Sequence, residues 1–172
     1  MAEPNGERVK IREVGPRDGF QNEPEVIATD DKVRLVAAGC EEVAFGDTTG
    51  MANPMQVRDF FTAAVDRLEG VELTAHFHNT RGQGLANVLA ALESGCESFE
   101  SSFGELGGCP VPKGATGNIA TEDLVSMLHE MGVDTGVDLG RLLEASREAQ
   151  RVLARPLGSH TLVAGPVDWH AA

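Results

Sequence analysis

Two hydrophobic periods alternate along the chain, and together they predict strands that are followed by helices. Short alternating or continuous apolar runs, typical of strands, occur at residues 9–14, 42–45, 71–78 and 98–103. Apolar residues spaced three and four apart predict helices at about 30–38, 54–68, 84–94, 121–131 and 139–153. From residue 155 onward proline and glycine interrupt both periods, and no element is predicted. Strands that alternate with helices favour a parallel βαβ topology.

Two of the helices carry start signals. Pro54 suits the first turn of the second helix, because proline presets the helical φ and has no N–H to leave unpaired. Thr121 is a plausible N-cap of the fourth helix. Glu122 and Asp123 would then lie in the first turn, where the helix dipole favours acids. We therefore interpret these two acids as helix-start residues.

The predicted elements make about four βα units, and this number limits the fold. A complete eightfold β/α barrel typically needs about 250 residues, whereas the chain has 172. The pattern therefore predicts an α/β fold that is either an open sheet or part of a barrel.

The chain is acidic and poor in aromatic residues. Its formal net charge is −13, and only 5% of its residues are aromatic. Such a charge repels nucleic acid and anionic membranes, and no apolar run is long enough to span a bilayer. We therefore expect neither nucleic acid nor membrane as a partner. An anionic substrate would need a bound cation or local Arg and Lys residues.

The cysteines and the first residues favour a reducing compartment. Cys40, Cys96 and Cys109 form no C-x-x-C pair, and their odd number argues against a disulfide framework. The first residues have neither the apolar stretch of a secretory signal nor an arginine-rich transit pattern. We expect a soluble, cytoplasmic protein.

Two histidines are candidate metal ligands. His76 and His78 lie two apart at the carboxyl end of a predicted strand, so both imidazoles point to one face. In parallel α/β folds this edge of the sheet is where ligands bind. Two imidazoles suit a metal whose other ligands are carboxylate or amide oxygens. The alternative is a pair of polar residues that merely ends a strand.

Other polar residues follow predicted strands at the same edge. Arg17 and Asp18 could offer a guanidinium to an oxyanion and a carboxylate to a metal, although a turn with a surface ion pair is the simpler interpretation. Asp47 either supports a site or forms a turn. Asn118 could reach the site with its side-chain oxygen. Cys109 lies on a glycine-rich loop that could close over a site. Its thiol could donate a proton there, or it could be unreactive.

Taken together, these segments resemble one family. They are VKIREVGPRDGFQNE at 9–23, GDTTG at 46–50, HFHNT at 76–80, GGCP at 107–110 and GNIATEDL at 117–124. They resemble the 3-hydroxy-3-methylglutaryl-CoA lyases, which belong to a superfamily of metal-dependent barrels. The FQNE and GGCP segments favour the lyases over the related synthases. The resemblance covers about residues 8–155, so we expect a partial (β/α)8 TIM-barrel domain there and tails at 1–7 and 156–172.

The resemblance implies a metal site and a reaction. Its metal ligands are Asp18, His76, His78 and Asn118, an oxygen-rich set that favours Mg²⁺ or Mn²⁺. The implied reaction is retro-Claisen cleavage of 3-hydroxy-3-methylglutaryl-CoA to acetyl-CoA and acetoacetate, as in leucine degradation. In it, Asp18 or His76 removes the hydroxyl proton. Arg17 would stabilise the thioester enolate, and Cys109 would act near its α-carbon.

The chain departs from the family in the number of its βα units. The family has eight, whereas here the first strand and the start of its helix join the unit at 42–45, with a seam predicted near 35–39. The missing strands include one with a catalytic glutamate. Three interpretations remain: a lyase completed as a homo-oligomer, since open strand edges favour association; a catalytically impaired remnant that still binds metal; or a lyase for a related 3-hydroxy-acyl-CoA.

Overall fold

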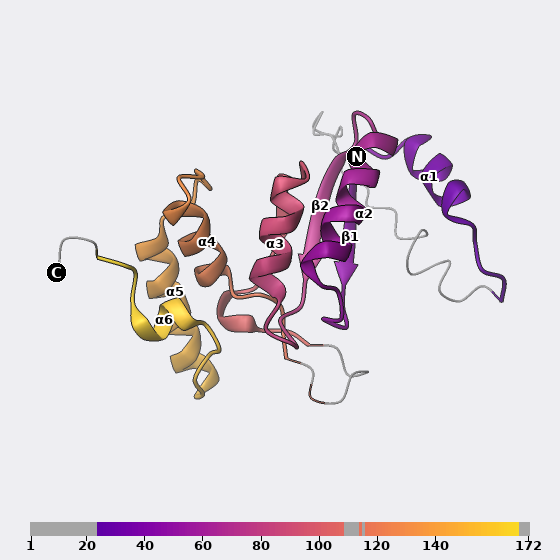
Figure 1. Ribbon diagram of the computed structural model, residues 1–172. Coiled ribbons are helices and arrows are strands. Elements are labelled where there is room, and N and C mark those ends of the chain that lie inside the picture. Colours follow the sequence, from indigo (N-terminus) through magenta and orange to yellow (C-terminus); the bar gives the residue numbers. More distant parts are fainter. Residues whose placement is uncertain (1–23, 109–113, 115, 169–172) are drawn as a thin grey trace, which may run out of the picture. The chain divides into compact units, whose positions relative to one another are not determined.

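The computed structural model describes residues 24–108, 114 and 116–168, and the chain divides into two compact units at residues 40 and 41 (Figure 1). This division falls next to the predicted seam. In the first unit the described element is helix α1 (Thr29–Ala37). The predicted strand at 9–14 lies outside the described residues. The candidate site residues that the structure describes, and the remaining elements, belong to the second unit.

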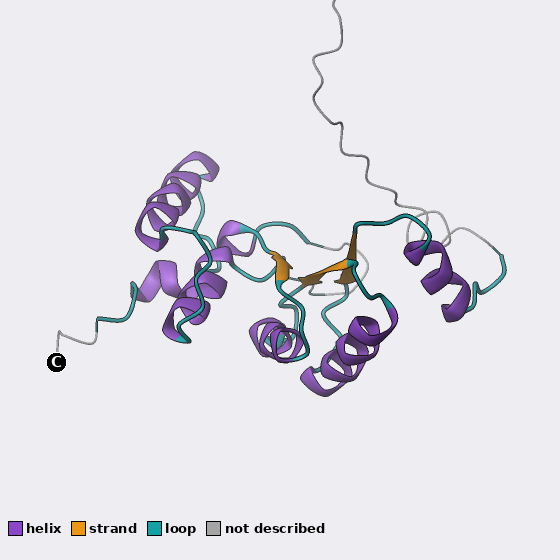
Figure 2. Ribbon diagram, turned by 90° about the horizontal axis from the view of Figure 1, so that it is seen from above, coloured by secondary structure: helices purple, strands orange, loops and turns teal. Residues whose placement is uncertain are grey.

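The second unit is built on a parallel sheet. Strands β1 (Glu42–Asp47), β2 (Glu72–Phe77) and β3 (Ser98–Glu100) lie in the order β1-β2-β3. Helices α2 (Pro54–Arg67) and α3 (Gly84–Glu93) connect them and lie on the same face of the sheet (Figure 2). Parallel strands with their crossover helices on one face form the wall of a β/α barrel.

The face covered by helices holds an apolar core. Leu73, Ala75 and Phe77 alternate along β2 and are buried. Phe61 of α2 is also buried, and its ring meets those of Phe45 and Phe77 edge-on, with centroids 6.0 and 6.5 Å apart. The alternation predicted for this strand therefore separates a core face from a second face, which carries the polar residues.

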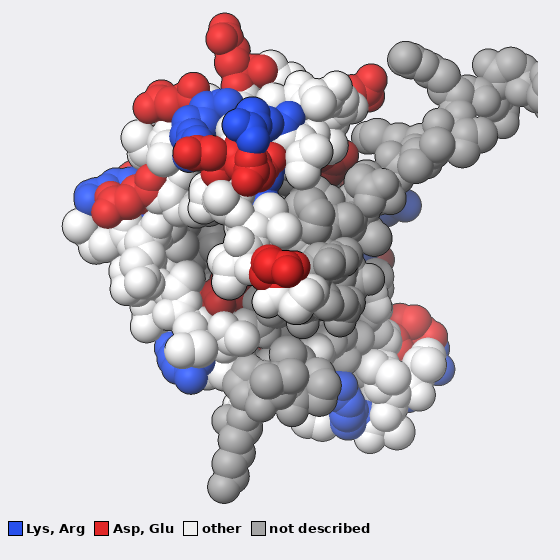
Figure 3. All heavy atoms as spheres, turned by 90° about the vertical axis from the view of Figure 1, so that its right-hand side faces the viewer, with Lys and Arg blue, Asp and Glu red and all other residues white. Residues whose placement is uncertain are grey.

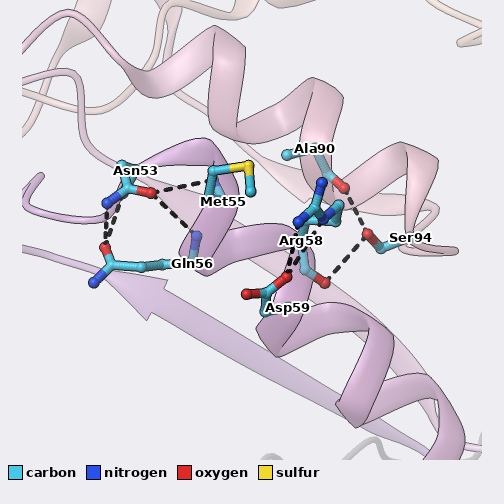
Figure 4. A network of polar contacts seen from close by, with 7 residues as sticks. All are labelled: Asn53, Met55, Gln56, Arg58, Asp59, Ala90 and Ser94. Atoms are coloured by element: carbon cyan, nitrogen blue, oxygen red, sulfur yellow. Dashed lines mark hydrogen bonds and ion pairs between the residues drawn. The ribbon is translucent and has the colours of Figure 1, made fainter.

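Helix α2 begins with a reciprocal cap (Figure 4). The side-chain oxygen of Asn53 accepts hydrogen bonds from the backbone N–H groups of Met55 and Gln56, while the Gln56 side chain accepts from the backbone N–H of Asn53. Pro54 takes the first helical position, which confirms the predicted start. These contacts fix where the chain leaves β1 and enters the helix.

A serine at the end of α3 ties that helix to α2. The Ser94 hydroxyl lies 2.8 Å from the carbonyl oxygen of Ala90 in its own helix and 3.4 Å from that of Arg58 in α2 (Figure 4). Arg58 also forms an exposed ion pair with Asp59. The two helices that cover the sheet are thus joined by a polar contact as well as by packing.

The chain after β2 differs in two places from the predicted pattern. The strand predicted at 98–103 ends at Glu100, and a 3-10 helix, η3 (Phe103–Glu105), follows. Helices α4 (Thr121–Glu130) and α5 (Leu139–Leu153) are confirmed, but α6 (His160–Ala164) was not predicted. No helix in the described part of the chain is long and apolar enough to cross a membrane.

The prediction that Thr121 caps α4 was wrong. The N-cap is Ala120, and the Thr121 hydroxyl instead shares a hydrogen bond of 2.9 Å with that of Ser101. A residue that already has a partner across the fold is not available to cap its own helix. The helix start is therefore fixed by tertiary contacts rather than by a local side-chain cap.

The two acids that follow also bind other segments. Both oxygens of the fully buried Glu122 accept from the backbone N–H of Gly104 in η3, at 3.1 and 2.9 Å. Asp123 accepts from the Ser159 hydroxyl and from two backbone N–H groups at the start of α6. Their interpretation as helix-start residues of α4 alone was therefore incomplete.

Candidate metal site

The two histidines of the β2 end lie side by side, as their spacing predicted. The Nε2 atoms of His76 and His78 are 3.2 Å apart. Two nitrogens that each bind a divalent cation at about 2.1 Å, at a right angle, would be about 3 Å apart. The same distance allows one ring to donate a hydrogen bond to the other. The pair is therefore spaced to share either a proton or a cation.

A carboxylate of the neighbouring strand orients the first histidine. Glu100 lies opposite His76 in the β2–β3 register, and its Oε2 is 2.9 Å from Nδ1 of the imidazole. With Nδ1–H donating to Glu100, the lone pair of His76 remains on Nε2, on the side of His78. Sequence reasoning missed Glu100. The predicted strand continued to residue 103, so the sequence did not mark Glu100 as a residue at the strand end; its role follows from the β2–β3 register.

The second histidine is buried, and this favours its neutral form. His78 is 6% exposed. Burial lowers the pKa of its imidazole, the nearby His76 lowers this pKa further, and the carboxylate of Asp47 opposes the change. A neutral imidazole is the form that binds a metal.

Asp47 itself shapes the loop after β1. Its carboxylate accepts hydrogen bonds from the backbone N–H groups of Met51 at 3.1 Å and Ala52 at 3.0 Å. Of the two roles considered for Asp47, the contacts support the turn-forming one directly. Its charge also acts on His78, so the two roles are compatible.

Asn118 contributes an oxygen that lacks a partner. A backbone bridge pairs Asn118 with His78. Its amide nitrogen donates to the carbonyl of Leu106 at 2.8 Å, which fixes which way the amide faces. Its Oδ1 is buried without a hydrogen bond among the described residues. A buried acceptor without a partner is costly, so this atom fits a ligand such as a cation.

The other predicted site residues lie outside the described residues. These are Arg17, Asp18 and Cys109. In the part of the chain that is described, no group of three or more His, Cys, Asp or Glu side chains could hold a metal ion. The candidate ligands among the described residues are two imidazoles and one amide oxygen, and the fourth predicted ligand is the carboxylate of Asp18.

Comparison with known proteins identifies the family. Residues 33–148 match the family described as HMGL-like. The chain is 43% identical to an (R)-citramalyl-CoA lyase of Chloroflexus aurantiacus over 88% of its own length and 47% of that protein. It is 46% identical to a mitochondrial hydroxymethylglutaryl-CoA lyase of Arabidopsis thaliana over 76% of its length and 28% of that protein.

A solved structure confirms the fold. An HMG-CoA lyase from Acinetobacter baumannii, in complex with coenzyme A and 3-methylmalate, superposes with a TM-score of 0.74 at 41% identity, over 84% of this chain and 49% of that one. The chain thus spans less than half the length of the relatives it matches, and its fold is part of a β/α barrel. The match over residues 33–148 places it in a family: the chain belongs to the HMGL-like proteins.

Proposed function

We propose that the chain binds a divalent cation, Mg²⁺ or Mn²⁺, through His76, His78, Asn118 and Asp18. The observation that supports the proposal most is the combination of two Nε2 atoms 3.2 Å apart with a buried amide oxygen that has no partner in the described chain. A mixed set of imidazole and oxygen ligands favours Mg²⁺ or Mn²⁺, whereas a closed zinc site would favour cysteine ligands.

The reaction we propose for this site is cleavage of a 3-hydroxy-acyl-CoA, with 3-hydroxy-3-methylglutaryl-CoA as the substrate. A bound cation would lower the pKa of the substrate hydroxyl. Because Glu100 engages Nδ1 of His76, only Nε2 of that ring can bind the cation or accept a proton. It cannot do both in one step, which favours Asp18 as the base. Arg17 is proposed to stabilise the enolate, and Cys109 to protonate it.

A second substrate has support of its own. The relative from Chloroflexus aurantiacus, a citramalyl-CoA lyase, aligns over more of this chain than the plant hydroxymethylglutaryl-CoA lyase does. Both substrates are hydroxy-acyl-CoA esters, so the same site chemistry applies to both. Parallel assays with the two esters will decide between them.

We expect cleavage by this chain to be slow. It spans less than half of its relatives, and the strands it lacks would position the acyl group and supply a proton-transfer residue. A misplacement of about 1 Å costs about 10²-fold, and loss of a proton-transfer group costs about 10²–10⁴-fold. The expected activity is at least about a thousandfold below that of a complete lyase.

Calorimetric titration with Mn²⁺ tests the site. The wild-type chain should show one site that His76→Ala abolishes, while His129→Ala serves as the matched control, because His129 is exposed and contacts Thr135. Unchanged binding in His76→Ala would refute the assignment. In the same preparation, release of acetoacetate is measured with Arg17→Met as the control. Near-normal turnover that Arg17→Met abolishes would contradict the expected slow reaction.

We also propose that the protein forms a homo-oligomer. Among the described strands, β1 and β3 each pair on one side only. An apolar hollow of about 310 Å³, lined in part by Phe45, Phe60 and Phe61, lies beside β1, and Phe60 is 47% exposed. Open strand edges and exposed aromatic rings favour association. Light scattering should report more than the 18.2 kDa of one chain; a compact monomer would contradict the proposal.

Charge and compartment remain predictions. Basic and acidic side chains are intermingled on the face drawn in Figure 3, so this face carries local cations in spite of the net charge of −13. The cytoplasm is still the expected compartment, although the plant relative is named as mitochondrial. Fractionation of cells that express the protein would decide this.

A further inference from the structure

Glu105, the last residue of η3, has an unusual backbone conformation. Its φ is +59°, and in the described chain only one other non-glycine residue, Ala154, has a positive φ. For a residue with a Cβ this left-handed conformation is strained. The conformation therefore persists only because other contacts of Glu105 offset the cost.

The side chain of Glu105 is held at the end of the histidine strand. The amide nitrogen of Asn79, the residue after His78, donates to Oε1 of Glu105. Asn79 also accepts from the backbone N–H of Gly84 at 3.2 Å, and its own backbone N–H donates to the carbonyl of Gly117 at 3.1 Å. The Glu105 carboxylate is thus joined to a residue that binds the start of α3 and the segment before Asn118.

The backbone of Glu105 lies directly against that same segment. A Cβ placed on Gly117 would be 1.8 Å from the carbonyl oxygen of Glu105. A Cβ on Gly158 would be 2.7 Å from the Glu105 carboxylate. Because the Gly117 contact is with backbone, which cannot turn away, only glycine at this position allows the observed approach, whereas a side chain at Gly158 would have to displace the Glu105 carboxylate. Glu105 therefore sits at the meeting point of three segments.

Leu106, the residue after Glu105, contacts Asn118 directly. The carbonyl of Leu106 accepts the hydrogen bond that orients the Asn118 amide. The Leu106 side chain packs against a buried cluster formed by Leu143 of α5, Leu162 of α6 and Leu157 of the loop between these helices. Two contacts thus fix the Leu106 carbonyl: the hydrogen bond between Glu105 and Asn79, and the packing of the Leu106 side chain in the apolar cluster.

We propose that Glu105 is a positioning residue of the metal site: its contact with Asn79 holds the Leu106 carbonyl where it orients the Asn118 amide and leaves Oδ1 of Asn118 free to bind the cation. The inference rests on the proposed metal binding. It assigns to Glu105 no contact with substrate or cation, only the orientation of a ligand.

Three substitutions of Glu105 separate the effect of its carboxylate on Mn²⁺ binding from the effect of its backbone strain. Glu105→Gln keeps an acceptor for Asn79 and keeps the strain, so it should bind Mn²⁺ like the wild-type chain. Glu105→Ala keeps the strain and loses the contact. Glu105→Gly loses the contact but adopts a positive φ without strain. Loss of an outer contact to a ligand typically costs about 10–100-fold in affinity, so both Glu105→Ala and Glu105→Gly should bind Mn²⁺ at least about 10-fold more weakly.

A double-mutant cycle tests whether Glu105 acts through Asn118. Mn²⁺ affinity is measured by calorimetry for Asn118→Ala, Glu105→Gly and the double variant, and circular dichroism establishes that each is folded. If Glu105 acts through Asn118, Glu105→Gly should add no loss to that of Asn118→Ala. Additive losses, or a Glu105→Gly variant with wild-type affinity, would overturn the inference. If Glu105→Gly fails to fold, the comparison of Glu105→Ala with Glu105→Gln decides in its place, and equal affinities refute the inference. Failure of the wild-type chain to bind Mn²⁺ would instead refute the proposed function.

Discussion

The two faces of the sheet are formed by the same strands but are stabilised by different interactions. On one face, Leu73, Ala75 and Phe77 of β2 are buried among apolar side chains, and α2 and α3 cover them (Figure 2). On the other face the alternate residues of β2, Thr74 and His76, are polar. The pleat of one strand thus separates the apolar residues of the core from the polar residues of the candidate site.

The polar face is satisfied by contacts between strands rather than by covering helices. Thr74 is 2% exposed, and its hydroxyl lies 2.9 Å from that of Ser98 and 3.2 Å from the carboxylate of Glu42. One row further, His76 meets Glu100. Polar rows of this kind allow a face to hold ionisable groups near one another. Substitutions on the two faces should therefore have separable effects.

The largest effect is expected on the apolar face. Phe61 is 2% exposed, and truncating a buried phenylalanine typically costs about 3–5 kcal/mol. Phe61→Ala should lower the free energy of unfolding by that amount in urea denaturation, with Mn²⁺ affinity unchanged in the folded protein. Phe60→Ala, on the same helix but 47% exposed, is the matched control and should cost far less. Equal losses for the two variants would show that burial of Phe61 against the apolar face does not set its contribution to stability.

A substitution on the polar face should change the free energy of unfolding less, but it should weaken metal binding. Glu100→Gln removes the charge that engages His76 and should weaken Mn²⁺ binding about 10-fold. Because the Glu100 side chain is 43% exposed, the loss of the ion pair should change stability by less than about 1 kcal/mol. The exposed Glu97→Gln is the control. If Glu100→Gln binds Mn²⁺ normally, the negative charge of Glu100 does not contribute to metal binding by His76.

The smallest effect concerns Cys96, a titratable group that is fully buried before β3. Burial raises the pKa of its thiol above the ordinary value of 9.0. The unfolded thiol ionises first as pH rises, so the contribution to stability is full below about pH 9 and decreases as pH increases toward the folded pKa. Between pH 8 and pH 10, urea denaturation should show a larger loss for the wild type than for Cys96→Ser. Parallel curves would contradict this.

Local patterns predicted the elements that are long and regular. The bounds of α5 (Leu139–Leu153) match the predicted helix, because a fifteen-residue amphipathic period is contained in the sequence itself. The shared face of His76 and His78 followed from the pleat alone, and the 3.2 Å contact confirms it. Whether they bind a metal remains a prediction.

Features set by tertiary contacts could not be found in this way. Glu100 and Glu105 matter because of residues about 24 to 26 positions away, His76 and Asn79. The five-residue α6 is too short to show a period. Its only local signal was Ser159, whose hydroxyl accepts from the N–H of Leu162. The end of β3 at Glu100 likewise depends on the turn into η3 rather than on strand propensity.

The contacts of Asp123 also have a consequence for how the protein opens. A helix of five residues is not stable alone, because the cost of its nucleation is not recovered. The first turn of α6 is held by the carboxylate of Asp123, which belongs to α4. Once α4 unwinds, α6 loses these bonds. The two helices should then exchange their amide protons as one cooperative unit, and the slowest protons of α6 should report the lifetime of α4.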